Sequence, residues 1–570
     1  MRRAVSALVV GLSFVSLLVA ASPAHAADSV QVTISASHAT VFGPTRVVMK
    51  GRVRPARPGS PALLQRRSSS WHTIARTTVT RTRTFRFAVR PRYGTTPYRV
   101  ISPKAAGRPT GVSRTVTLTR RHDCTATPRP TARVRGFFTR PGRPAPSPVT
   151  RGLHGTICAA ARNSTVRIAL YYVHLGSREV ERVLDALRFV HARRNVRVQI
   201  VLDERVYRER TDGPATLRTL RKFAQVTTCF RGCRATDPLP GGGGTNELQH
   251  NKFLLVSNTT WQPGADPLVL QSSANWSWPQ LADRYQSAVV LWKDATLYRE
   301  YDARWESLNT CGTRGCSAWS ARAAGLGLDL ALYGVHLQDG VWVDPALGER
   351  RGSKNRGTAV TFSPWTGPDF VARELDRYTC RPGHDDVRLA QMIVSPYRPE
   401  VIDSLAGLQE RGCDVRVIMA ARKEALYKAG SATLREEELD VDCAPKLHDK
   451  FLFVDAVRRS TGAPEHAVWE GSHNLAQSAL RLGDEALLRV SVERAGPDSR
   501  VDNGALWQQF AGQYRYLAKR VTRCPRTTRP SPDPEETSTP EPTPSETPAP
   551  DETPAPDETP TVEPTEPVLG

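Results

Sequence analysis

The chain has 570 residues and a formal net charge of +23 at pH 7. Beyond residue 26 no segment is apolar over the ~20 residues that a spanning helix needs, which excludes a multi-span membrane protein. Residues 531–570 hold 11 acidic residues and no Lys or Arg, so the remainder carries +34. A body this basic indicates an anionic partner: phospholipid head groups, nucleic acid or wall polymers.

Residues 1–26 predict a cleaved signal peptide. Arg2 and Arg3 form a positive start, an apolar stretch follows at 4–21, and Ala24-His25-Ala26 has the small-x-small pattern of a cleavage site. A retained membrane anchor is the alternative, and the apolar stretch is short for a span. We expect a secreted, extracellular protein that is cleaved after Ala26.

Ten cysteines, an even number, predict disulfides in an exported protein. Cys229 with Cys233 and Cys311 with Cys316 are close enough in sequence for small local loops. A zinc site is the alternative, but these spacings lack a second paired set. The pairing of the other six stays open; they are Cys124, Cys158, Cys380, Cys413, Cys443 and Cys524.

Residues 28–119 contain short runs of alternating polar and apolar residues, separated by turn residues at intervals of roughly 8–12. This pattern predicts a small antiparallel β-sandwich, and it resembles immunoglobulin-like modules. Two roles stay open for it, binding to wall or substrate, and a spacer. Residues 120–133, rich in Arg, Pro and Thr, are expected to form a linker.

A repeat follows. In each copy a buried strand, an amphipathic helix and a second buried strand succeed one another, and the first two segments recur at an offset of 221 residues, as Val166 and Val387 show. We assign residues 134–320 to a first α/β half and 358–525 to a second, joined by the Gly-rich segment 321–357. Residues 526–570, rich in Pro, Thr and Glu, are expected to form a disordered tail.

Each half also contains a His-x-Lys motif at the start of an apolar run. A chain with 13 His and 11 Lys would contain this motif about 0.25 times by chance. It occurs twice, at His250/Lys252 and at His448/Lys450. Each copy is followed by an Asn in a Ser-x-Asn context; these are Asn275 and Asn474.

These motifs resemble those of the phospholipase D superfamily, in which His-x-Lys-x(4)-Asp and a downstream Gly-Ser-x-Asn both occur twice. The second copy matches fully, with Asp455 and Ser472. The first departs at Ser257, in place of Asp, and at Ser272, in place of Gly. The resemblance implies an α/β fold, in which two pseudo-symmetric halves form one catalytic domain preceded here by the all-β sandwich.

The resemblance also implies roles, without metal or cofactor. His250 would attack phosphorus and form a phosphohistidine, and His448 would protonate the leaving oxygen and then activate water. The other catalytic residues would hold phosphoryl oxygens; they are Lys252, Lys450, Asn275 and Asn474, with Ser273 and Ser472 as supporting hydroxyl donors. Asp455 would support its strand.

A carboxylate downstream of one motif commonly orients the His of the other half in this superfamily. Eleven residues beyond the Asn stand Glu485 in the second copy and Gln286 in the first. Glu485 is therefore expected beside His250. His448 is left with Gln286, or with nearby Asp283.

The expected activity is hydrolysis of phospholipid head groups at a membrane surface by a monomer. One alternative is a secreted nuclease, since some superfamily members cut nucleic acid and this chain is basic. Another is a non-catalytic wall- or lipid-binding protein. Four aromatic residues after the first motif are expected either in the core or on a lipid- or base-contacting rim; they are Trp276, Trp278, Tyr285 and Trp292.

Overall fold

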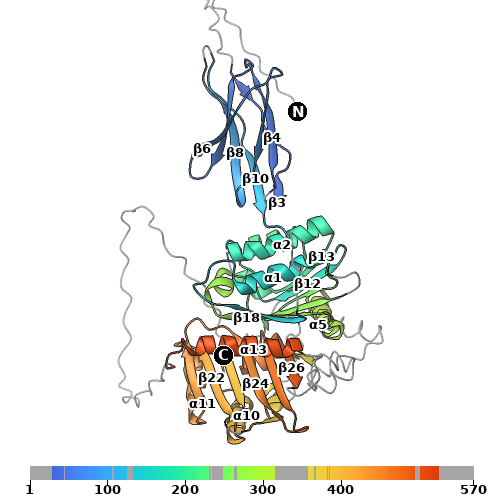
Figure 1. Cartoon of the computed structure of the whole chain (residues 1–570), viewed down its shortest axis with the longest axis vertical. Coiled ribbons are helices and arrows are strands. Elements are labelled where there is room, and N and C mark those ends of the chain that lie inside the picture. Colours follow the sequence, from blue (N-terminus) through green and yellow to red (C-terminus); the bar gives the residue numbers. More distant parts are fainter. Residues whose placement is uncertain are drawn as a thin grey trace, which may run out of the picture. The chain divides into compact units, whose positions relative to one another are not determined.

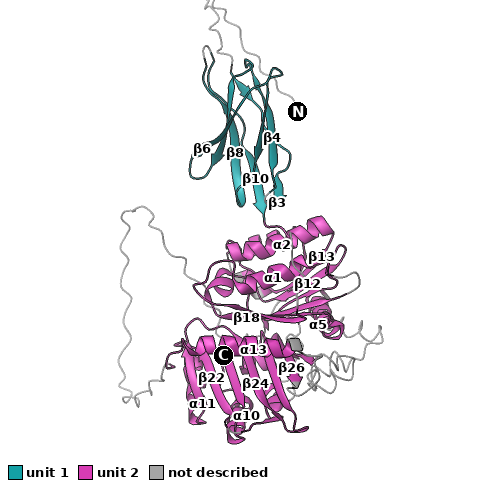
Figure 2. Ribbon diagram, in the orientation of Figure 1, with its two compact units in different colours: residues 1–121 teal, residues 122–570 magenta. Residues whose placement is uncertain are grey.

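The structure is a computed structural model. The predicted signal peptide, the tail, most of the segment 321–357 and Cys316 lie outside the residues that it describes. Those residues are 29–43, 45–105, 108–124, 132–209, 211–229, 233, 248–261, 266–314, 357–364, 368–381, 383, 385–493 and 501–524. The chain divides into two compact units, unit 1 at residues 1–121 and unit 2 at 122–570 (Figure 2).

Unit 1 consists of two β-sheets. One has the order β1-β4-β2 with β7 also on β4, and the other the order β3-β10-β8-β5-β6 with β9 on β8. All pairs are antiparallel except β3 with β10. The strands are β1 (Gln31–Val32), β2 (Ser35–Ala36), β3 (Thr40–Phe42), β4 (Val47–Arg54), β5 (Pro61–Arg67), β6 (Trp71–Thr78), β7 (Thr84–Val89), β8 (Gly94–Ser102), β9 (Gly111–Val112) and β10 (Val116–Arg121).

The alternating pattern of unit 1 buries one side of each sheet. Met49 and Phe87 of the first sheet share a core with Leu64 and Tyr98 of the second. Because apolar side chains of both sheets meet in this core, the unit is a sandwich. Strand β10 extends to Arg121, two residues into the segment expected to be a linker.

The first half of unit 2 is built on a seven-stranded sheet in the order β11-β18-β17-β16-β12-β13-β14. Its elements are β11 (Val134–Thr139), α1 (Pro148–Cys158), β12 (Thr165–Leu170), α2 (Arg178–Arg194), β13 (Arg197–Asp203), α3 (Glu204–Glu209), α4 (Gly213–Leu220), β14 (Gln225–Cys229), β15 (Leu248–Gln249), β16 (Lys252–Val256), β17 (Leu268–Ser272), the π-helix η1 (Pro279–Asp283), β18 (Gln286–Trp292) and α5 (Ala295–Arg314).

The second half has a nine-stranded sheet in the order β15-β26-β25-β24-β21-β22-β23, with β19 also on β26 and β20 on β24. Its elements are β19 (Thr358–Ser363), α9 (Phe370–Leu375), β20 (Tyr378–Thr379), β21 (Asp386–Gln391), α10 (Pro399–Glu410), β22 (Asp414–Ala420), α11 (Ala425–Glu436), β23 (Asp440–Ala444), β24 (Lys450–Arg458), β25 (Pro464–Gly471), α12 (Gln477–Arg481), β26 (Gly483–Glu493) and α13 (Val501–Ala518).

The predicted repeat is confirmed element by element. Strands β12 and β13 are parallel and joined by α2, and β21 and β22 are parallel and joined by α10. The His-x-Lys strands β16 and β24 then pair antiparallel with β12 and β21. Helix α2 begins where the sequence provides a cap, because the Ser177 side chain accepts a hydrogen bond from the Val180 amide.

The two sheets face each other across one core. Apolar residues on the inner side of each sheet pack there with α5 and α13, among them Phe253, Trp305, Phe451 and Phe510. Helices α1 and α2 cover the outer side of the first sheet, and α9 and α10 that of the second (Figure 1). The interface between the halves is therefore a folded interior, which positions the two motifs rigidly.

Four disulfides join described residues of unit 2. Cys229–Cys233 is the predicted local loop, and the six open cysteines pair as Cys124–Cys158, Cys380–Cys413 and Cys443–Cys524. Cys311 is disulfide-bonded as well. Within the described ranges, no helix combines the length and the apolar character required to span a bilayer.

Candidate active site

The two motifs are anchored reciprocally, each on the other half. His250 precedes β16, and its backbone amide donates to the carbonyl of Asp484 in β26 (3.0 Å). His448 precedes β24, and its amide donates to the carbonyl of Tyr285, next to β18 (3.1 Å). Each His thus takes its place from the strand that follows the Asn of the opposite half.

Both motif lysines are buried, and the ammonium group of each donates a hydrogen bond within its own motif. Lys252 Nζ donates to the carbonyl of His250 (3.0 Å), and Lys450 Nζ donates to the carbonyl of His448 (3.1 Å). Both ammonium groups favour the ionised form of the Glu485 carboxyl. Two cations from different halves therefore act on one carboxylate. Cations held in this way can also stabilise negative charge on a bound anion.

His250 contacts the carboxyl that the spacing predicted. Its Nδ1 lies 2.7 Å from Oε1 of Glu485, so this predicted pairing is confirmed. Burial raises the pKa of Glu485 to about 8, against the opposing effect of Lys252. A contact of this length is a hydrogen bond, in which one of the two groups donates a proton to the other. With the proton on Nδ1, Nε2 carries the electron pair that a nucleophile needs.

His448 has a different environment. Its Nδ1 lies 3.0 Å from Nε2 of Gln286 and 3.0 Å from Nζ of Lys450. The alternative partner, Asp283, instead pairs with Lys446 at 2.7 Å. An ammonium group can only donate, so Nδ1 of His448 accepts, and the proton of the neutral ring lies on Nε2. When the ring is protonated, Nδ1 can instead donate to Oε1 of Gln286 (3.3 Å), and Nε2–H of the imidazolium can protonate a leaving oxygen.

The two serines of the Ser-x-Asn segments hold the partners of the histidines. Ser273 Oγ donates to Oε1 of Gln286 (2.7 Å), and Ser472 Oγ accepts from the Ala486 amide (3.1 Å). A hydrogen bond from Ser472 also lowers the pKa of Glu485. Their hydroxyls are thus directed at positioning contacts, whereas the sequence suggested donors to substrate.

Both asparagines are buried at the ends of these segments. Arg398, fully buried, donates to the backbone carbonyl of Asn474 (3.2 Å) and pairs with Asp369. Asn275 is enclosed in the first half. A buried guanidinium with a carboxylate partner fixes the Asn474 loop, because moving it would leave a charge unpaired.

The motif Asp lies in β24 and its replacement, Ser257, directly follows β16, so both are away from the histidines along the chain. Asp455 lies 3.4 Å from Nε2 of His466, and the Ser257 hydroxyl accepts from the Thr165 amide (2.9 Å). Ser257 therefore supplies its own strand contact, which fits the structural role expected for this position.

The structure adds Gln280, which the sequence did not single out. Its amide lies 3.3 Å from Nε2 of His448, and it also hydrogen-bonds Gln286. Gln280 comes from the π-helix η1, and nothing in the spacing of the motifs points to it. A polar group at the reacting nitrogen can orient His448 or a bound oxygen.

Two further buried carboxyls lie in the second half only. Burial raises the pKa of Asp449 to about 7, and burial raises the pKa of Glu470 well above its ordinary value. The strand registers place Asn251 and Gln271 at the equivalent positions of the first half. Asp449 stands between His448 and Lys450, so its position was visible in the sequence but its protonation was not.

The four aromatic residues after the first motif divide between the two predicted locations. Trp276, Tyr285 and Trp292 are buried, whereas Trp278 is 53% exposed. On the second half Tyr397 is 68% exposed. Trp278 precedes η1, two residues before Gln280, and Tyr397 directly precedes Arg398. Each half thus exposes one large ring next to a residue that contacts the site.

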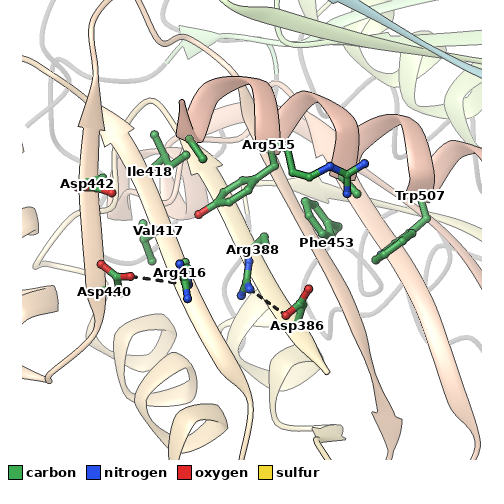
Figure 3. A pocket seen from close by; sticks show the side chains of 13 residues that line it. Asp386, Arg388, Arg416, Val417, Ile418, Asp440, Asp442, Phe453, Trp507 and Arg515 are labelled. Atoms are coloured by element: carbon green, nitrogen blue, oxygen red, sulfur yellow. Dashed lines mark hydrogen bonds and ion pairs between the residues drawn. The ribbon is translucent and has the colours of Figure 1, made fainter. Parts of the chain in front are cut away.

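A cavity of about 400 Å³ lies elsewhere, on β21, β22 and β23 beside α13 (Figure 3). Two of its three guanidinium groups face acids of the same cavity, Arg388 at 2.8 Å from Asp386 and Arg416 at 3.8 Å from Asp440. None of the motif residues lines it. The charges of Arg388 and Arg416 are thus offset by neighbouring acids within the cavity.

The fold and this paired site define a class: two-lobed proteins in which each His-x-Lys motif is anchored on the opposite half. A family model described as cardiolipin synthase, PLD-like domain, matches residues 156–309 and 383–498, which include both motifs. This match places the two matched regions, which carry the motifs, in the PLD-like domain family. No curated protein sequence is similar enough to serve as a relative.

Solved structures with similarity include a phospholipase D family member, Nuc, from Salmonella typhimurium (18% identity, TM-score 0.23, 30% of this chain and 99% of that one). Phosphatidylserine synthase from Haemophilus influenzae is 12% identical, with a TM-score of 0.43, over 66% of this chain and 85% of that one. Yeast tyrosyl-DNA phosphodiesterase is 12% identical, with a TM-score of 0.35, over 64% and 91%.

Proposed function

We propose that the protein is an exported phosphodiesterase of phospholipase D type that hydrolyses the head groups of phospholipids. The observation that carries this proposal is the reciprocal anchoring of the motifs. His250 is held by Asp484 and Glu485 of the second half, and His448 by Tyr285 and Gln286 of the first. A single half would lack the partner of its own histidine.

The environments of the two histidines support different roles. His250, with Nδ1 on Glu485, would attack phosphorus through Nε2, forming an N–P bond. His448, starting as the imidazolium, would pass its Nε2 proton to the oxygen of the departing head-group alcohol as the P–O bond breaks, and would be left as the neutral ring. His448 would then take a proton from water, which attacks phosphorus and releases His250 and the phosphatidate.

The choice of a lipid substrate is supported by the exposed aromatic residues. Trp and Tyr favour the boundary between membrane and water, because their rings are apolar and their N–H or O–H groups are polar. In the described part of unit 2, Trp278 and Tyr397 are the exposed large apolar side chains. Each adjoins a residue that contacts the site, so both are placed to meet the surface that presents the substrate.

A secreted nuclease is the second candidate, because the same two rings could stack on bases. Purified full-length protein offered vesicles of phosphatidylcholine, phosphatidylglycerol or cardiolipin, or plasmid DNA, separates the two. The proposal expects release of choline or glycerol and phosphatidate from the vesicles, equal with and without EDTA. His250→Asn should abolish release, and His38→Asn, an exposed histidine of unit 1, should not.

Two further variants probe the lipid surface. Trp278→Ala and Tyr397→Ala should reduce turnover of vesicles by about threefold to tenfold, since each ring contributes about 1 kcal/mol of interfacial contact. Turnover of a soluble short-chain phospholipid should stay unchanged. Nicked plasmid without any lipid turnover would show that the protein is a nuclease. Turnover of neither substrate would contradict the proposal that the protein is an enzyme.

A further inference from the structure

Unit 1 has a charge composition unlike that of the rest of the chain. Residues 29–121 contain 19 Lys and Arg and no Asp or Glu, whereas residues 122–530 contain 58 and 44. A preference of the whole chain for Arg does not explain this contrast, because it would not remove acids from one unit alone. Cations in the described part of unit 1 therefore have no carboxylate partner among residues 29–121.

These cations lie at the surface. All 19 are described, 14 are exposed and 5 are partly exposed. On β4, Lys50, Arg52 and Arg54 alternate with the buried residues, so they share the outer face of the sheet. Arg86 of β7 pairs directly opposite Lys50 on that face. This face thus presents four cations, which we call the β4 basic face.

The β4 basic face is unfavourable for the fold by itself. Like charges directly opposite each other on paired strands destabilise a sheet. Within residues 29–121, which include the described part of unit 1, there is no acid to offset the repulsion between Lys50 and Arg86. An external anion would offset it, so the arrangement indicates a partner that carries many negative charges.

We propose that unit 1 binds the surface of anionic phospholipid bilayers through the β4 basic face. The strand residues paired with the cations of β4 are otherwise small or polar, namely Gln31, Ser35 and Thr84, and none of the strand positions on this face holds an aromatic ring on which a base could stack. A flat row of cations without a stacking platform suits an extended anionic surface. The choice of lipid over nucleic acid also rests on the proposed function.

The test measures binding without turnover. Full-length protein in the His250→Asn background is sedimented with vesicles of phosphatidylcholine alone or with about 30% phosphatidylglycerol, in about 50 or 300 mM NaCl. The altered protein carries Lys50→Glu, Arg52→Glu and Arg54→Glu. A control with equal net charge carries Arg178→Glu, Arg197→Glu and Arg218→Glu, all exposed in unit 2.

The parent should bind the anionic vesicles, and high salt should release it. Each basic residue near such a surface is worth about 1 kcal/mol, or about fivefold in affinity, so the β4 variant should bind on the order of 100-fold more weakly. The control should lose far less. Thermal unfolding should show that the β4 variant is folded and no less stable, because a carboxylate at position 50 would oppose Arg86 favourably.

Equal losses in the β4 variant and the control would overturn the proposal, since net charge alone would then explain binding. Equal binding to neutral vesicles would overturn it too. A β4 variant that loses binding to duplex DNA but not to vesicles would assign the face to nucleic acid instead. Because binding is read in a variant without the attacking histidine, failure of the proposed hydrolysis would leave this result unaffected.

Discussion

The two halves of unit 2 share a topology, but they treat their histidines differently. His250 faces the carboxyl of Glu485, whereas His448 faces the amide of Gln286 and the ammonium of Lys450. The backbone contacts that anchor the two residues are equivalent. A duplicated scaffold can therefore hold two chemically distinct half-sites, because the side chain beside each imidazole ring sets which of its nitrogens carries the proton.

Replacing each histidine in turn tests the two assigned roles most directly. His250→Asn should lower turnover by at least about 10⁴-fold, as loss of a nucleophile does. His448→Asn should do the same with ordinary substrate. With a p-nitrophenyl ester, whose leaving group needs no acid, His448→Asn should still release one equivalent in a burst and retain the phosphoenzyme, and His250→Asn should show none. Bursts from both variants would contradict the assigned roles.

Glu485→Gln makes the two half-sites alike. Partners that orient a reacting histidine are worth about 10- to 100-fold, so turnover should fall by that factor. Purely structural damage would alter unfolding as well, whereas a positioning role should change the pH dependence of turnover while the melting temperature stays close to that of the parent. An unchanged pH profile with unchanged turnover would show that the contact with His250 is dispensable.

The buried acids of the second half predict a dependence of stability on pH. The folded pKa of Asp449, about 7, lies above its ordinary value, so the folded state holds this proton more tightly. Stability from this group is fully present below pH about 4 and is lost up to pH about 7, at roughly 1.4 kcal/mol per pH unit. Asp449→Asn places here the residue found at Asn251 in the first half. The free energy of unfolding, measured by urea titration at a series of pH values, should then vary less with pH over this window. A parent-like slope in the variant would refute the assignment.

Gln286→Glu should have the smallest effect. The new carboxylate would stabilise the charged ring of His448 and raise its pKa, so the alkaline limb of the activity profile should move to higher pH. Turnover at the optimum should change by only about threefold, because the ring keeps its backbone anchor to Tyr285. A shift of the limb to lower pH would contradict the proton assignment for His448.

Much of the fold was predictable from the sequence. The strand–helix–strand repeat, the sandwich pattern before it and the local Cys229–Cys233 loop follow from periodicity and spacing, which depend on residues near in the chain. The pairing of His250 with Glu485 was also predictable, because a fixed spacing after Asn474 in a repeated scaffold leads to a fixed position. The pairing of the six separated cysteines was not, since it depends on how distant segments meet.

The sequence by itself determined the two half-sites and the acid-free composition of residues 29–121, because motifs and charges are properties of the chain. Only the tertiary structure decided the site's asymmetry. Lys450 reaches Nδ1 of its own histidine, Gln280 reaches Nε2 from η1, and burial keeps Asp449 protonated beyond its usual range. These features depend on distances and dielectric across a packed interface, which no spacing along the chain encodes.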